Sequence, residues 1–195
     1  MVVGGVDYGA LPEEGDARQG GPAAPANLVR SSPWSVGFAP LPATLDEALG
    51  IAGLWVERGA GEPVVLSGEG GSRARLVESA PRASFLHVAT HGWFAPESVV
   101  SAAAPPPVGR RSGPTAMSRD EQVRGSSPMV LCGLALAGAN GPADFLGRVP
   151  GLITAEEVAS LDLSRCEVAV LSACETSLGV RRAGQGVASL QQALL

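Results

Sequence analysis

The stretch FLHVATHG, residues 85–92, decides the fold class of this chain of 195 residues. It is a short apolar run that ends in a histidine and a glycine. A second run, VAVLSA at residues 168–173, ends in the same way at Cys174. Short apolar runs bounded by loop residues are typical of strands buried on both faces of a parallel sheet. Ligands gather at the carboxyl ends of such strands. The two runs therefore predict an α/β fold with His91 and Cys174 at one edge of its sheet.

Helices are expected between the strands in the first half of the chain. The sequence predicts strands at Met1–Asp7 and Pro63–Ser67. Between them, Thr44–Glu47 has the pattern of a capping box with Thr44 as the N-cap, and it predicts an amphipathic helix to about Arg58. Strands that alternate with helices imply right-handed crossovers and a mainly parallel sheet.

The second half of the chain continues this alternation. Ser72 is expected to cap a helix that ends at Ser79, and a strand is predicted at Met129–Leu136. Thr154–Glu157 forms a second capping-box pattern, and a further helix is expected from about Gly184. The buried face of this last helix is predicted to consist of Val187, Leu190 and Leu194.

Two segments near residues 8–43 and 93–128 are rich in Gly, Pro, Ala and Ser. Such a composition buries too little apolar surface to order itself well, so both are expected to be low-complexity loops. The chain begins on a strand pattern and ends inside a helix pattern. Residues 1–195 are therefore expected to form one partial domain.

The composition excludes several classes of function. The net charge is -5, and the basic residues cluster only as the pairs Arg110–Arg111 and Arg181–Arg182, so we expect no nucleic-acid partner. No apolar run is long enough to span a membrane and no secretory signal is present, so no membrane partner is expected. The three cysteines are an odd number, which favours a reducing cytoplasm over a disulfide framework.

A thiol and an imidazole side by side make a nucleophile and its base. The imidazole of His91 would lower the pKa of the Cys174 thiol from its ordinary value of about 8.5, and would later protonate a leaving amine. Gly92 lets the backbone approach a substrate carbonyl, and the amide of Cys174 is the natural second donor to an oxyanion. These residues indicate acyl transfer, with no cofactor.

Each of these residues also has a simpler interpretation. A cysteine at the end of an apolar strand is commonly a small buried residue, and His87, inside its strand, is expected to be a core or near-site histidine. Zinc binding by His87, His91 and Cys174 is possible by ligand type, but no Cys-x-x-Cys or His-Glu-x-x-His spacing supports it, so no metal is expected. Asp7 and Glu175, near strand ends, are expected to stabilise loops.

Taken together, the motifs resemble the CHAT domain, the caspase-like peptidase domain commonly attached to tetratricopeptide repeats. The matching blocks follow one another along the chain: Val2–Gly9, His87–Gly92, Leu134–Gly138, Leu152–Val158, Leu171–Thr176 and Gly184–Val187. The resemblance implies a caspase-like three-layer sandwich, with His91 and Cys174 as a catalytic dyad and Gly92 beside the oxyanion site.

The chain departs from the family pattern at three places. Ser177 stands where the family usually has glycine, and Gln185 replaces a usual glutamate. The family normally continues past the position of Leu195 into another core strand, so the resemblance implies a domain truncated at its C-terminus.

The resemblance also implies a cysteine endopeptidase that cleaves a protein partner in the cytoplasm, regulated within a larger protein that contains tetratricopeptide repeats. Two alternatives remain open at this point. One is a non-catalytic caspase-like scaffold or signalling module, and the other is an inactive fragment.

Overall fold

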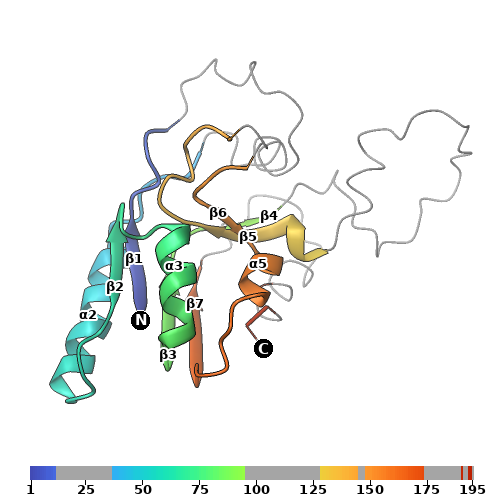
Figure 1. The fold of residues 1–195 in the computed structure, drawn as a ribbon. Helices are drawn as coiled ribbons and strands as arrows, with labels where there is room; N and C mark the ends of the chain where they lie inside the picture. The colour runs from blue at the N-terminus through green and yellow to red at the C-terminus, as the bar shows by residue number, and fades with distance from the viewer. Residues whose placement is uncertain (12–36, 95–127, 145–147, 174–189, 191–192, 195) are drawn as a thin grey trace, which may run out of the picture.

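A computed structural model describes residues 1–11, 37–94, 128–144, 148–173, 190 and 193–194. Within them lies a four-stranded parallel sheet with the strand order β2-β1-β3-β7. Its strands are β1 (Val2–Val6), β2 (Val65–Gly68), β3 (Phe85–Ala89) and β7 (Val168–Ser172). Figure 1 shows them running upward side by side. The prediction of a mixed α/β fold with a mainly parallel sheet is confirmed.

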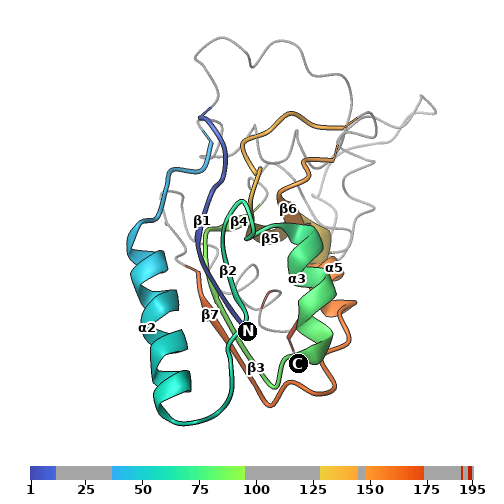
Figure 2. The same ribbon diagram turned by 60° about the vertical axis from the view of Figure 1, so that its left-hand side comes forward.

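Helices cover both faces of this sheet. Helix α2 (Ala43–Glu57) lies on one face, and α3 (Arg73–Ser79) and α5 (Ala155–Ala159) lie on the other (Figure 2). A short 3-10 helix, η3 (Ala80–Arg82), follows α3. The result is the helix–sheet–helix layering of a sandwich.

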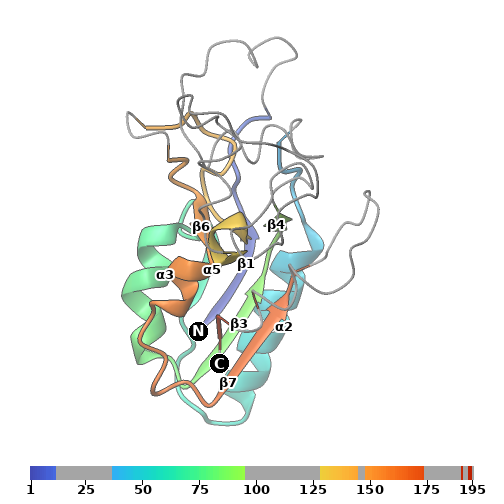
Figure 3. The same ribbon diagram turned by 90° about the vertical axis from the view of Figure 1, so that its right-hand side faces the viewer.

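A second, three-stranded antiparallel sheet lies across the carboxyl ends of the parallel strands (Figure 3). It contains β4 (Gly92–Phe94), β5 (Cys132–Ala135) and β6 (Leu152–Thr154). The sequence did not predict this sheet. The single strand predicted at Met129–Leu136 is wrong in its first half, because Pro128–Leu131 forms the 3-10 helix η4 before β5 begins.

The start of α2 packs closely on β1 because β1 carries two glycines. A Cβ at Gly4 would collide with the carbonyl oxygen of Thr44, so only glycine lets the helix approach this far. The hydroxyl of Thr44 accepts a hydrogen bond from the N–H of Gly5 (2.9 Å) and donates one to the carbonyl of Leu41 (2.7 Å). Thr44 therefore joins the helix to the sheet.

The capping box predicted at Thr44 is consequently wrong. The helix begins at Ala43, its N-cap is Pro42, and no side chain caps it. The carboxylate of Glu47, expected to reach back to the N-cap, contacts His87 on β3 instead (2.9 Å). Both side chains of the motif bind residues of the sheet instead of capping the helix.

The other two helix starts agree with the sequence. The hydroxyl of Ser72 accepts a hydrogen bond from the N–H of Arg75 (3.4 Å) at the start of α3. At α5 the complete capping box is present: the hydroxyl of Thr154 accepts from the N–H of Glu157 (3.2 Å), and the Glu157 carboxylate accepts from the N–H of Thr154 (2.9 Å). These predictions are confirmed.

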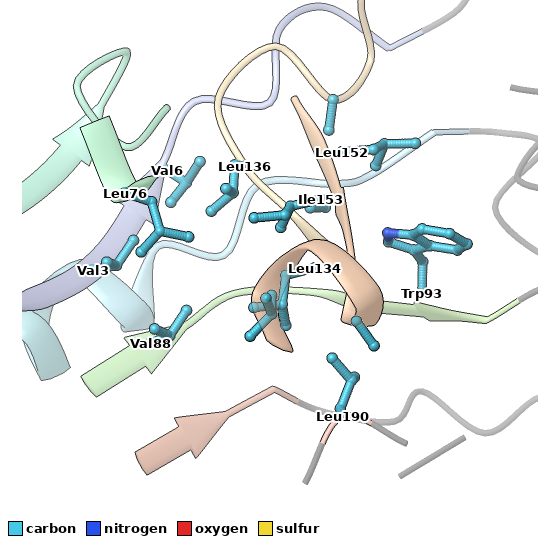
Figure 4. Close-up of a cluster of buried hydrophobic side chains, with 14 of the residues drawn as sticks. Val3, Val6, Leu76, Val88, Trp93, Leu134, Leu136, Leu152, Ile153 and Leu190 are labelled. Carbon is cyan, nitrogen blue, oxygen red and sulfur yellow. The ribbon is translucent and has the colours of Figure 1, made fainter. Parts of the chain in front are cut away.

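The core lies between the parallel sheet, α3 and the antiparallel sheet (Figure 4). Its buried side chains include Val3, Leu76, Val88, Leu134, Leu136 and Ile153. Leu190 is buried against this core, as the sequence predicted, and Leu194 is partly buried there. Val187 lies outside the described residues.

The two apolar runs that predicted the fold differ in burial. β3 is buried from Leu86 to Ala89, as expected for a strand between two neighbours. β7 is not buried on both faces: Val168 is 48% and Val170 38% exposed. Within the described residues β7 pairs with β3 alone, so it lies at the edge of the sheet. The expectation of two fully buried strands is wrong for β7.

Much of both low-complexity segments, residues 12–36 and 95–127, lies outside the described residues. At the described ends of these segments, Tyr8, Phe38 and Trp93 are almost completely buried. In the part of the chain that the structure describes, no helix has the length and apolar character needed to cross a membrane.

Candidate active site

His91 lies just beyond the carboxyl end of β3, where the chain passes from the parallel sheet into β4. Its carbonyl accepts a hydrogen bond from the N–H of Ala135 on β5 (2.9 Å), which fixes the backbone at this point. The residue is only 5% exposed. The histidine predicted to carry the chemistry is therefore held at the junction of the two sheets.

The imidazole of His91 is oriented by a main-chain carbonyl. Its Nε2 lies 2.8 Å from the carbonyl oxygen of Ala39, in the segment that leads into α2. A carbonyl oxygen only accepts hydrogen bonds, so Nε2 must carry the proton. In the neutral ring the lone pair is then on Nδ1, which makes Nδ1 the basic nitrogen.

Two aromatic rings pack against this imidazole. The ring centroid of Tyr8 lies 5.2 Å from that of His91, and the centroid of Phe38 lies 5.7 Å from it. Both aromatic residues are nearly inaccessible to solvent. They restrict the rotation of the imidazole and shield the hydrogen bond to Ala39 from water.

The hydroxyl of Tyr8 belongs to a buried chain of hydrogen bonds. Thr90 Oγ1 lies 2.5 Å from the carbonyl of Ala135, and this acceptor takes the single Thr90 hydroxyl proton. Tyr8 must therefore donate its own proton to Thr90 Oγ1, at 2.8 Å. Burial raises the pKa of Tyr8 above its ordinary value, although the hydrogen bond to Thr90 opposes this shift. Tyr8 is thus a neutral donor at physiological pH.

Gly92 is the first residue of β4 and pairs with Leu134 on β5. Because the neighbouring bond runs from the N–H of Ala135 to the carbonyl of His91, Gly92 and Leu134 form a non-hydrogen-bonded pair. The N–H of Gly92 therefore points away from β5. A Cβ added at Gly92 would lie 3.8 Å from the Cβ of Ala173, the residue before Cys174.

Cys174, the predicted nucleophile, lies outside the described residues, as do Glu175, Ser177 and Gln185. The described part of β7 pairs in parallel with β3, with Phe85 opposite Val168 and Ala89 opposite Ser172. Ala173 is the last described residue of this segment.

The remaining candidates have structural partners. His87 is buried and its Nε2 contacts the carboxylate of Glu47, which agrees with the interpretation of a core histidine. The carboxylate of Asp7 accepts a hydrogen bond from the N–H of Gly9 (2.9 Å), so it stabilises the loop after β1 as expected. Among the described residues, no group of three or more His, Cys, Asp or Glu side chains could hold a metal ion.

Sequence reasoning missed two residues near the histidine, Ala39 and Asn140. Ala39 acts through its carbonyl, which no side-chain pattern reveals. Asn140 follows β5, and its side chain binds the backbone of the segment before Ala39. Asn140 begins an Asn-Gly-Pro sequence, and such a sequence indicates a turn rather than a site residue.

Comparison with known proteins identifies the family. A family model described as the CHAT domain matches residues 11–195. No match was found among curated proteins or among solved structures. The matched segment contains the two histidines, the orienting carbonyl and the cysteine block, and it covers most of the chain. The chain therefore belongs to the CHAT domain family, a caspase-like peptidase family whose members typically occur in proteins with tetratricopeptide repeats.

Proposed function

We propose that this chain is a caspase-like cysteine endopeptidase domain in which His91 is the base and Cys174 the nucleophile. The register of β3 and β7 is the observation that carries the proposal. Ala89 lies opposite Ser172, and each strand needs two more residues to reach the proposed dyad. Continued in step, the two chains would bring His91 and Cys174 to neighbouring positions at the carboxyl edge of the sheet.

The orientation of the imidazole suits this role. With Nε2–H directed at the Ala39 carbonyl, Nδ1 is the nitrogen that takes the thiol proton of Cys174. The thiolate then attacks the carbonyl carbon of the scissile peptide bond, a C–S bond forms, and the carbonyl π electrons move to oxygen. When this tetrahedral intermediate collapses, the C–N bond breaks and His91 returns the proton to the leaving amine.

Hydrolysis of the acyl-enzyme completes the cycle. Water attacks the thioester while His91 takes one of its protons, and collapse releases a new carboxyl group and the Cys174 thiol. Both tetrahedral intermediates carry an oxyanion, which needs N–H donors that are already in position. The N–H of Gly92, directed away from β5, supports its assignment as one donor, and the N–H of Cys174 is proposed as the second.

The setting of this activity is also a proposal. Members of the family typically occur in proteins with tetratricopeptide repeats, so we expect the substrate to be a protein and the site to be regulated within a larger repeat-containing protein. Residues 1–195 would then belong to one caspase-like domain that acts in the cytoplasm.

Cysteine alkylation across pH tests the proposal directly. The chain and its His91→Ala variant are treated with limiting iodoacetamide, and each cysteine is followed by peptide mapping. We expect Cys174 to react fastest near neutral pH and to lose that advantage without His91, because the thiolate fraction depends on the imidazole. Cys132, which is buried, and Cys166 serve as internal references in the same sample.

If Cys174 reacts no faster than Cys166 and His91→Ala has no effect, the dyad is not assembled and the peptidase proposal fails. A non-catalytic scaffold or an inactive fragment would then describe the chain, and circular dichroism with limited proteolysis separates a folded scaffold from a poorly folded fragment. If Cys174 is activated, Cys174→Ala should abolish cleavage of candidate protein substrates while preserving the fold.

A further inference from the structure

Asn140 makes several hydrogen bonds to the segments around His91. Its Oδ1 accepts from the N–H of Phe38 (2.7 Å), and its Nδ2 donates to the carbonyls of Phe38 and Gly9 (3.0 Å each). Its own N–H donates to the carbonyl of Tyr8 (2.8 Å). One side chain therefore joins the exit of β1 to the segment that precedes α2.

Two of these bonds hold the backbone of a single residue, Phe38. The amide of Asn140 binds both the N–H and the carbonyl of Phe38, much as a neighbouring β-strand would. The next residue is Ala39, whose carbonyl receives Nε2–H of His91 at 2.8 Å. Asn140 thus holds the backbone of the residue immediately before that carbonyl.

We propose that Asn140 is a positioning residue that orients the His91 imidazole through the Ala39 carbonyl and so sustains the reactivity of Cys174. This inference rests on the proposed function. In this inference Asn140 contacts neither His91 nor the substrate, and acts through the backbone of residues 38 and 39.

The amide is the chemical group that this position requires. It must accept one hydrogen bond and donate two, and of the small side chains only asparagine does both in this geometry. Aspartate at this position would keep the acceptor for the Phe38 N–H, but its carboxylate would face the carbonyls of Phe38 and Gly9. Alanine would leave the Phe38 backbone groups without these partners, beside a side chain that is almost completely buried.

The consequence for chemistry follows from charge. When Cys174 gives its proton to His91, the imidazolium donates to the Ala39 carbonyl more strongly than the neutral ring does. A carbonyl free to turn away would no longer favour the thiolate–imidazolium pair. The described titratable group in ring contact with His91 is Tyr8, which stays neutral in the working range because burial raises its pKa.

The test measures the alkylation rate of Cys174 by iodoacetamide against pH in the full chain and in Asn140→Ala. We expect the midpoint of this profile to move up by about one pH unit, which corresponds to a roughly tenfold smaller acid dissociation constant of the thiol. Asn140→Asp should shift the midpoint in the same direction. Asn140→Ser, which keeps a smaller polar group, provides a milder variant should alanine prevent folding.

Thr154→Ala is the matched control for a loss of stability alone. It removes the capping box of α5, whose contacts lie outside the His91 surroundings. We expect its thermal midpoint to fall while the Cys174 profile stays at the wild-type position. If Thr154→Ala moves the profile as far as Asn140→Ala does, Asn140 is a structural residue only and the inference is overturned.

A double variant separates this inference from the proposed function. If Asn140 acts through His91, then Asn140→Ala should add nothing to the Cys174 profile of His91→Ala. An additive effect contradicts the proposed route through His91. If His91→Ala itself leaves the Cys174 profile unchanged, the peptidase proposal fails. If only His91→Ala changes it, the dyad stands and the role of Asn140 is refuted.

Discussion

The two strands that lead to the proposed dyad are held very differently by the rest of the fold. β3, which leads to His91, lies between β1 and β7 and is buried from Leu86 to Ala89. β7, which leads to Cys174, lies at the edge of the sheet among the described residues, and Val168 and Val170 on one of its faces are exposed. The strand of the base is therefore buried between two neighbours, whereas the strand of the nucleophile has one described neighbour, one face packed on the core and one exposed face.

Truncation of one apolar side chain in each strand should give the largest contrast. Leu86→Ala in β3 should lower the free energy of unfolding by about 2–5 kcal/mol, because Leu86 is 3% exposed and its loss leaves a cavity. Val170→Ala in β7 should cost less than about 1 kcal/mol, because its side chain already contacts water. Urea unfolding of both variants measures the difference. Equal losses would show that β7 is held as firmly as β3.

Two glycines of the antiparallel sheet are expected to differ in their role: Gly133 is needed for packing, and Gly92 is proposed to serve the chemistry. Gly133→Ala should destabilise the fold by about 1–3 kcal/mol or more, because its Cβ would collide with the carbonyl oxygen of Ile153 on the neighbouring strand. Gly92→Ala should fold almost normally, because its Cβ would meet Ala173 only at an ordinary 3.8 Å. Thermal unfolding of both variants checks this.

If Gly92 serves the approach of substrate, as proposed, Gly92→Ala should slow the reaction of Cys174 with a peptide-based acylating probe without lowering the thermal midpoint. A parallel fall in stability and reactivity would instead make Gly92 a packing residue.

The sequence was most informative where local pattern and tertiary structure agree. The apolar runs before His91 and Cys174 correctly predicted β3 and β7 of the parallel sheet. The pattern at Thr154 and Glu157 correctly predicted a capping box. The same letters at Thr44 and Glu47 misled, because a sheet packed nearby offered both side chains stronger partners. A local motif predicts a cap only while no distant group competes for it.

The environment of His91 was beyond the reach of pattern analysis. Its orienting acceptor is a main-chain carbonyl in a segment that composition classed as poorly ordered. At the described end of that segment, one aromatic side chain, Phe38, is 1% exposed and anchors residues whose neighbours are mostly Pro, Gly and Ala. Long-range hydrogen bonds such as those of Asn140 also leave no periodicity in the sequence.

The contact between α2 and β3 offers a test on the base side alone. Glu47→Ala would leave Nε2 of the buried His87 without its carboxylate, and should lower the free energy of unfolding by about 1–3 kcal/mol. Glu47→Gln keeps an acceptor oxygen and should cost less. Denaturant unfolding gives both values. Neither variant should move the pH profile of Cys174 alkylation. A clear shift would mean that His87 influences the reactivity of Cys174.

The smallest expected effect concerns the hydroxyl of Tyr8. Tyr8→Phe removes the donor to Thr90, while Thr90 keeps its bond to Ala135, so the loss should be about 0.5–1.5 kcal/mol near neutral pH. Burial raises the pKa of Tyr8 above 10.0, so the folded state holds the phenol proton more tightly than the unfolded chain does. Its contribution to stability is thus fully present below the unfolded pKa and is lost as pH rises through the folded one.

Tyr8 is the single tyrosine of the chain, so phenolate absorbance reports this one group. The native protein should ionise at higher pH than the urea-unfolded chain, and Tyr8→Phe should remove that part of the alkaline loss of stability. Coincident titrations would mean that water reaches the hydroxyl in solution. The Tyr8 ring that packs against His91 would then be less shielded from water than its burial indicates. The difference between a buried base and a nucleophile on an edge strand would be correspondingly smaller.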